Sequence, residues 1–315
     1  MWVVNKRKIF YAFSGILVAA SFLSLAVWGL VPGIDFTGGT LIDVSYPAGR
    51  PDQTLLSASL APIDAQASIR PSGSNEYIVR LRPIDQGEKT QVLAALQASE
   101  QTASSTVAAQ ELAASSTSAA GTVTTFDSVG PVLGAEALRK AYVSIFLVII
   151  GIVLFITFAF RKVSEPVSSW KYGLTAIIAL VHDVIIPVGA FSVLGHFAGY
   201  EVDTLFVTAL LVVLGFSVHD TIVVFDRVRE NLSQNNGKKS FAEVVGMSIS
   251  QTFTRSINTS ATTLIALVVL YIFGGSTTAH FSLALIVGIA AGTYSSIFIG
   301  SPLLVTIEKW GKRDK

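Results

Sequence analysis

Six apolar stretches constrain this chain more than any other feature of its sequence. Each is close to the ~20 residues that an α-helix needs to cross the hydrocarbon core of a bilayer. Helices are required, because an open sheet in lipid would leave its backbone polar groups unpaired. The predicted spans are residues 9–31, 141–160, 172–194, 204–225, 256–273 and 281–307.

The composition agrees with a multi-span membrane protein. Hydrophobic residues make up 51% of the 315 residues and charged residues only 14%, a balance too apolar for an ordinary soluble domain. The formal net charge of +1 gives no indication of a nucleic-acid partner, and none is expected. The chain has no cysteine, so any part in an oxidising compartment must fold without a disulfide.

Residues 32–140 differ from the rest, because no stretch within them is apolar enough to cross a membrane. Alternating apolar and polar residues predict strands at 40–46, 65–70, 77–82 and 122–129, and helical patterns lie at 53–60 and 89–114. The order βαββαβ is typical of a ferredoxin-like α+β domain. Residues 98–121 are rich in Ser, Ala and Thr, which fits either a poorly packed helix or a loop.

The distribution of Lys and Arg predicts the orientation in the membrane. Fifteen of them lie in four segments, namely residues 1–8, 161–171, 226–255 and 309–315, whereas residues 195–203 and 274–280 hold none. Basic residues in short segments stay in the cytoplasm. We therefore expect both termini, including the tail 308–315, to be cytoplasmic, and residues 32–140 to be an extracytoplasmic domain of a protein in the cell (inner) membrane.

Two acidic residues lie inside predicted spans. Asp220 costs roughly 2.5–3.5 kcal/mol to insert, so it is expected to have a partner or a function. Asp183 shares its helix face with small residues and should point into the bundle. At 1.5 Å per residue, Asp183 lies roughly 16 Å and Asp220 roughly 8 Å from the cytoplasmic ends of their spans. The two carboxylates are therefore not expected to pair.

Arg255 begins the fifth span on a polar face and is predicted to meet Asp220. Movement of Arg255 would then change the affinity of Asp220 for a proton, which makes this pair a candidate proton-coupling site. His182 and His219, adjacent to the two acids, would either relay protons or bond a carbonyl. Three structural interpretations stay open: Asp183 as an acceptor that fixes helix packing, Asp220 in a purely structural role, which its neighbouring His and predicted Arg partner make weaker, and Arg255 as an anchor to lipid headgroups.

Four motifs carry a resemblance to a known family. Residues 31–40 read VPGIDFTGGT, residues 182–184 read HDV, residues 215–231 read GFSVHDTIVVFDRVREN and residues 254–264 read TRSINTSATTL. Together they resemble the SecF family, the smaller membrane subunits of the SecD–SecF accessory complex of bacterial Sec protein export. The likeness covers essentially the whole chain.

The resemblance implies a membrane fold of six transmembrane helices of the resistance-nodulation-division superfamily with one external domain. The implied partners are SecD, the SecY–SecE–SecG channel, a translocating unfolded polypeptide and membrane lipids. The implied function is use of the proton-motive force in late stages of export, without covalent catalysis, metal or cofactor. The family's proton-linked aspartate and its motif arginine fall on Asp220 and Arg255. Its glycine-rich signature falls on Gly33, Asp35, Phe36, Thr37, Gly38, Gly39 and Thr40.

Alternatives remain for the glycine motif and for the function. The paired glycines permit a turn with positive φ, which serves either as a simple turn into the domain or in coupling the domain to the spans. A proton-driven small-molecule exporter of the same superfamily is the alternative function, although such exporters carry two large external domains. A passive scaffold is a third class, which would leave the buried Asp220 unexplained.

Overall fold

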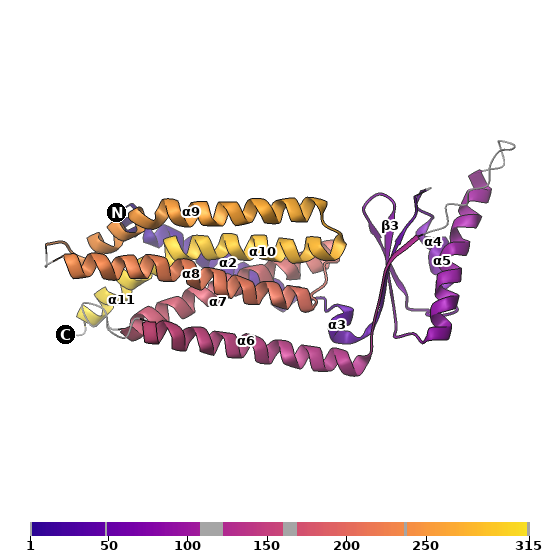
Figure 1. The fold of residues 1–315 in the computed structure, drawn as a ribbon, viewed down its shortest axis with the longest axis horizontal. Helices are drawn as coiled ribbons and strands as arrows, with labels where there is room; N and C mark the ends of the chain where they lie inside the picture. Colours follow the sequence, from indigo (N-terminus) through magenta and orange to yellow (C-terminus); the bar gives the residue numbers. More distant parts are fainter. Residues whose placement is uncertain (1, 48, 108–121, 160–168, 236–237, 314–315) are drawn as a thin grey trace. The chain divides into compact units, whose positions relative to one another are not determined.

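A computed structural model describes residues 2–47, 49–107, 122–159, 169–235 and 238–313. The chain divides into two compact units, Met1–Val31 with Ala141–Lys315, and Pro32–Lys140 (Figure 1). Each unit has its own hydrophobic core.

Long apolar helices make up the first unit. In the described part of the chain, six helical segments are long and apolar enough to cross a membrane, which confirms the prediction of six membrane-spanning helices. After the short α1 (Trp2–Asn5), the spans are α2 (Arg7–Trp28), α6 (Pro131–Ala159), α7 (Ser169–Ala198), α8 (Thr204–Gln234), α9 (Phe241–Phe273), and α10 (Ser276–Ser295) continued by α11 (Ser301–Arg313).

The sixth span differs from its prediction as one regular helix. A π-helical turn, Ser296–Gly300, separates α10 from α11. Hydropathy could not reveal this turn, because the apolar run continues through it. Helix α2 ends at Trp28, before the predicted end of its span at residue 31. Helices α8 and α9 extend beyond their predicted spans, since a helix does not end where lipid ends: α8 continues to Gln234, and α9 begins at Phe241, where Ser240 forms a capping box with Glu243.

Helix α10 packs against α7, α8 and α9, and α2 packs against α7 (Figure 1). Glycines allow these helices to approach closely. A Cβ at Gly288 would lie 2.3 Å from a methyl carbon of Val213, and one at Gly189 would lie 2.5 Å from the Cα of Ser21. Small residues at such crossings are typical of membrane helix pairs, in which close packing provides much of the attraction.

The second unit is a four-stranded antiparallel sheet with helices on one face (Figure 1). The strand order β2-β3-β1-β4, joined through two helices, confirms the βαββαβ prediction. The elements are α3 (Ile34–Thr37), β1 (Gly39–Ser45), α4 (Gln53–Leu60), β2 (Ser68–Ser72), β3 (Glu76–Leu81), α5 (Gln86–Val107) and β4 (Thr122–Val129). Of the stretch 98–121, residues 98–107 continue α5, and residues 108–121 lie outside the described residues.

The core of this unit forms between the sheet and helices α4 and α5. Alternate residues of β1 and β3 face the helices, which supply four leucine and valine side chains that are fully buried: Leu56, Leu60, Val92 and Leu96. Asp52 caps α4 by accepting a hydrogen bond from the backbone N–H of Thr54 at 2.8 Å. Hydrogen bonds from the backbone N–H and hydroxyl of Thr54 hold the pKa of Asp52 below its usual value.

Candidate functional site

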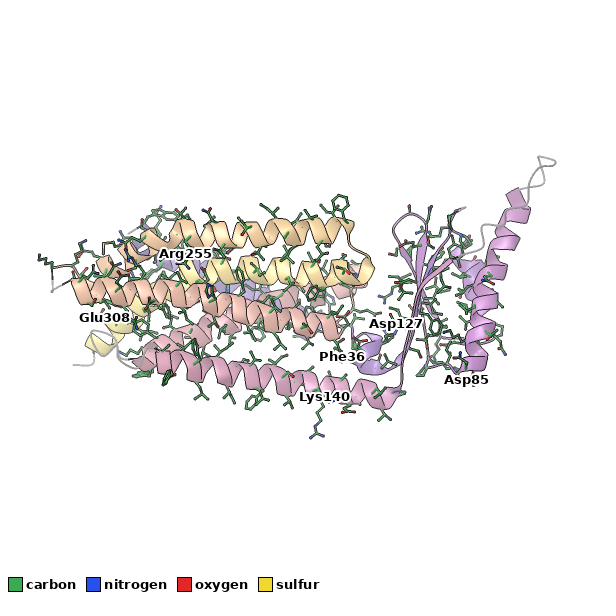
Figure 2. All side chains as sticks on the ribbon, viewed as in Figure 1. Phe36, Asp85, Asp127, Lys140, Arg255 and Glu308 are labelled. Carbon is green, nitrogen blue, oxygen red and sulfur yellow. The ribbon has the colours of Figure 1, made fainter. Side chains whose placement is uncertain are left out.

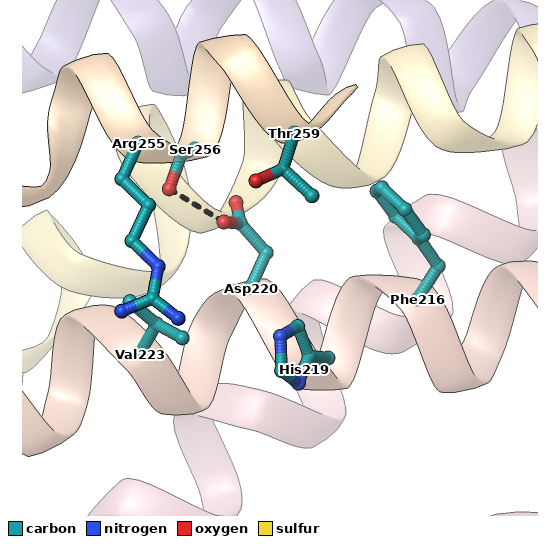
Figure 3. A pocket seen from close by; sticks show the side chains of 7 residues that line it. All are labelled: Phe216, His219, Asp220, Val223, Arg255, Ser256 and Thr259. Carbon is teal, nitrogen blue, oxygen red and sulfur yellow. Dashed lines mark hydrogen bonds between the residues drawn. The ribbon is translucent and has the colours of Figure 1, made fainter. Parts of the chain in front are cut away.

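Helices α8 and α9 bring the side chain of Asp220 against the hydroxyl of Ser256. Asp220 is only 7% exposed, and Ser256 Oγ donates a hydrogen bond to its Oδ1 at 2.5 Å (Figure 3). The second oxygen, Oδ2, is buried and accepts no hydrogen bond in the described part of the chain. Asp220 is therefore a carboxylate that is only half satisfied.

A small cavity lies beside this carboxylate. Its volume is about 30 Å³, more than the ~10–15 Å³ that one water molecule requires. A water placed there could bond Oδ2 and exchange a proton with it. The lining residues, all drawn in Figure 3, are Phe216, His219, Asp220, Val223, Arg255, Ser256 and Thr259.

Arg255 and His219 lie beside Asp220, as the sequence predicts, but unlike Ser256 they do not hydrogen-bond its carboxylate in the described part of the chain. Both line the cavity and are near enough to interact electrostatically with the carboxylate. Among the described residues, the direct hydrogen bond to Asp220 comes from Ser256 and not from Arg255. Sequence reasoning missed Ser256. Its position one residue after Arg255, on the same helix face as the buried Ser260, was the available signal.

Asp183 lies in a fully buried site on α7. Its Oδ2 accepts hydrogen bonds from Ser217 on α8 and from Ser295 on α10, the latter at 2.7 Å, and its Oδ1 lies 2.8 Å from Nδ1 of His182. His182 also stacks on the ring of Tyr294. Asp183 thus points into the bundle, as its small-residue face predicts, and its two hydroxyl donors favour the packing interpretation.

A layer of buried hydroxyls lies between the two acids. Ser217 is one helical turn before Asp220 on α8. Thr221, next to Asp220, shares a 2.8 Å hydrogen bond with Ser296, the first residue of the π-helical turn. Asp183 and Asp220 therefore do not pair directly, in agreement with their predicted depths: Asp183 bonds residues of α8 and α10, whereas Asp220 bonds a residue of α9.

One face of α9 is polar and exposed, although α9 is long and apolar enough to span a membrane. Arg255 belongs to this face (Figure 2). Polar groups are costly to place against lipid, so protein or water must cover this face in the membrane. Its exposed polar residues are Gln251, Thr254, Arg255, Asn258, Thr259 and Thr262.

The glycine-rich motif lies in the second unit, where α3 leads into β1. Gly38 and Gly39 have φ values of +74° and +136°, in the region that favours glycine. A Cβ at Gly38 would lie 2.8 Å from the Cα of Pro131, and one at Gly39 would lie 2.9 Å from the carbonyl oxygen of Leu81. The two glycines are therefore required by both conformation and close packing.

The other residues of this motif support the turn. Phe36 is buried, and the hydroxyl of Thr37 donates to the carbonyl of Gly33 at 3.0 Å. Thr40 bonds Ser128 of β4 through their hydroxyls at 3.1 Å. Gly33 precedes α3 as its N-cap, and Asp35 lies in its only turn.

Two known protein families match parts of this chain that contain these residues. The family described as "Protein export membrane protein SecD/SecF, C-terminal" matches residues 109–310, which include Asp183, Asp220 and Arg255. The "SecD/SecF GG Motif" matches residues 23–46, which include Gly38 and Gly39.

Similar proteins match nearly the whole chain. The protein translocase subunit SecF of Thermobaculum terrenum is 41% identical, covering 99% of this chain and 94% of that protein. The corresponding subunit of Anaerolinea thermophila is 37% identical over 99% and 97%. A crystal structure of SecDF from Thermus thermophilus, described as translocon-associated, matches with a TM-score of 0.78 and 30% identity. That match covers 97% of this chain but only 38% of the SecDF chain.

Proposed function

Since this chain belongs to the SecF family of protein translocase subunits, we propose that it uses the proton-motive force to promote late stages of polypeptide export. Asp220 takes up and releases the coupling proton. The observation that carries this proposal is a buried carboxylate with one unbonded oxygen beside a cavity of about 30 Å³. Because its relatives are protein translocase subunits, export of polypeptides is favoured over export of small molecules.

The chemistry follows from the surroundings of Asp220. A charged carboxylate in a poorly solvated site is stabilised by a hydrogen-bond donor and by a nearby cation. Ser256 supplies the hydrogen bond, and Arg255 supplies the positive charge. Protonation removes the charge and weakens the attraction of Asp220 for Ser256 and Arg255, which would let α8 and α9 shift against each other at this point. One elementary charge crossing 100 mV provides roughly 2.3 kcal/mol, enough to shift a two-state equilibrium more than tenfold.

The protein is a multi-pass membrane protein, and its family and the SecDF structure support association with SecD. We expect SecD to cover the exposed polar face of α9, because this face cannot remain against lipid. The site beside Asp220 would then be completed by the partner. We further propose location in the inner membrane with both termini in the cytoplasm, and docking on the SecY–SecE–SecG channel.

The external domain is proposed to hold or release the emerging polypeptide. Gly38 and Gly39 would transmit the movement of the spans to β1, because both have a fixed backbone conformation and are closely packed. No bound cofactor is needed in this scheme, because the ion gradient supplies the energy.

Replacement of Asp220 tests the proposal. Asp220→Asn keeps the side-chain size but cannot release a proton at this site, so proton-driven export should be abolished while the complex still assembles. The measurement is export into proteoliposomes that contain the chain, SecD and the channel, with and without an imposed proton gradient.

The matched control is Asp226→Asn on the same helix. Asp226 is exposed and paired with Arg229 at 2.6 Å, so its loss should leave export unchanged. Export by the Asp220→Asn variant at the unmodified rate would refute the proposed role of Asp220.

A further inference from the structure

The proposed function leaves Asp183 without a role in proton exchange. We propose that Asp183 is a positioning residue for Asp220: it holds α8 and α10 together at the π-helical turn, so that Ser296 stays bonded to Thr221 and the neighbouring Asp220 side chain stays directed at Ser256. This inference rests on the proposed function of Asp220. In this inference Asp183 does not itself take up or release a proton.

The carboxylate of Asp183 joins three helices by accepting hydrogen bonds from two of its neighbours. The carboxylate is on α7, Ser217 is on α8 and Ser295 is on α10, and all three side chains are almost completely buried. A buried carboxylate that accepts several hydrogen bonds has a defined position, because each unmade bond would leave a buried polar group unsatisfied. The relative position of α8 and α10 is therefore fixed at this point.

The π-helical turn links this point to Asp220. Ser295 bonds Asp183, whereas the next residue, Ser296, bonds Thr221 at 2.8 Å. Thr221 follows Asp220 on α8, so this bond fixes the turn of α8 that presents Asp220 to Ser256. The wide turn has its own support, since the hydroxyl of Ser301 donates to the carbonyl of Ser296 at 2.9 Å. Single π-helical turns occur frequently at functional sites.

Loss of Asp183 should thus be felt at Asp220 through Thr221. Among the described residues, Ser295 would keep only its bond to the carbonyl of Gly292 in its own helix, so α10 could shift against α8, and the hydrogen bond from Ser256 to Asp220 would weaken. A carboxylate that loses a hydroxyl neighbour holds its proton to higher pH. The charged or titratable groups that face Asp220 are His219 on α8 and Arg255 on α9, while the described residues of α10 and the π-helical turn contribute hydroxyls.

An infrared titration in lipid tests this inference. The full chain with SecD is titrated with acid, and the carboxyl band of Asp220 is identified as the band that Asp220→Asn removes. Asp183→Ala, which removes the acceptor shared by Ser217 and Ser295, should raise the midpoint of that band by about half to one pH unit, the size expected from weakening of one hydrogen bond. Ser295→Ala should raise it by a smaller amount with the charge of Asp183 intact.

Ser260→Ala is the matched control, because it removes another buried interhelical contact, the 2.6 Å bond to Thr293, without touching Asp183. Its midpoint should be unchanged.

The sign of the shift separates positioning from charge. If Asp183 acted only as a nearby negative charge, Asp183→Ala would lower the midpoint, because Asp220 would ionise more easily; that result would overturn the inference. An unchanged midpoint in both Asp183→Ala and Ser295→Ala would also overturn it and leave Asp183 a packing residue. If no titrating band disappears in Asp220→Asn, the proposed function itself fails, and this inference fails with it.

Discussion

The two buried aspartates of the bundle lie in opposite kinds of surroundings. On the closed side, formed by α7, α8 and α10, Asp183 has partners for both oxygens and is fully buried. On the open side, formed by α8 and α9, Asp220 has a partner for one oxygen, and its other oxygen lies buried beside a cavity lined by the exposed Arg255 and His219.

This difference shows how one residue type serves two purposes within one bundle. A carboxylate whose hydrogen bonds are complete contributes to packing, because any change in its state disrupts several partners. A carboxylate with an unsatisfied oxygen and space for water can change its protonation with little rearrangement. Burial alone would not distinguish the two, since both are less than a tenth exposed.

The largest expected effect is on stability at the closed side. Asp183→Ala removes the shared partner of Ser217, Ser295 and His182 in a fully buried site, so it should destabilise the fold by about 3 kcal/mol. Asp220→Ala removes one hydrogen bond and should cost about 1 kcal/mol. Unfolding in detergent, followed by circular dichroism, measures both. Equal losses would remove the distinction between the two sides.

Substitution of two glycines by alanine tests the difference in packing between the two sides. Gly288→Ala on α10 places a methyl group 2.3 Å from Val213, so the closed side must separate, at a cost of about 1–3 kcal/mol. Gly215→Ala on α8 meets nothing within 4 Å, and the reduced freedom of the unfolded chain should stabilise by about 0.4–1 kcal/mol. The unfolding midpoints of the two variants should therefore move in opposite directions. A midpoint of Gly288→Ala at or above that of the unmodified chain would show that the closed side is loosely packed.

Arg255 should give the smallest change in stability and the clearest change in pH dependence. Because Arg255 is exposed, Arg255→Gln should change stability by no more than about 0.5 kcal/mol. Removal of its charge favours the protonated form of Asp220, so the pH profile of proton-driven export should move to higher pH. Arg255→Lys keeps the charge and should move the profile less. Identical pH profiles of export for the unmodified chain, Arg255→Gln and Arg255→Lys would leave Arg255 only a role as an anchor to lipid headgroups.

The external domain shows which element bounds can be predicted from the local sequence pattern. The strand at 122–129 and the helix at 53–60 were predicted with the bounds that the structure shows, because alternation and helical periodicity reflect burial on one face. The strand predicted at 65–70 is displaced to Ser68–Ser72. Its pairing with β3 continues through Pro71 up to a turn in which Gly73 has a φ of +56°, a feature that pattern alone does not locate.

Within the bundle, the sequence determined the six spans, the burial of Asp183 and Asp220, and the proximity of Arg255, because hydropathy and helical spacing are properties of one helix at a time. Only the tertiary structure decided that Ser256 bonds Asp220, that Asp183 joins three helices, and that the sixth span contains a π-helical turn. These features depend on the register of one helix against another. Neighbouring helices can slide past each other without altering any apolar pattern, so packing alone selects which hydroxyl reaches which carboxylate.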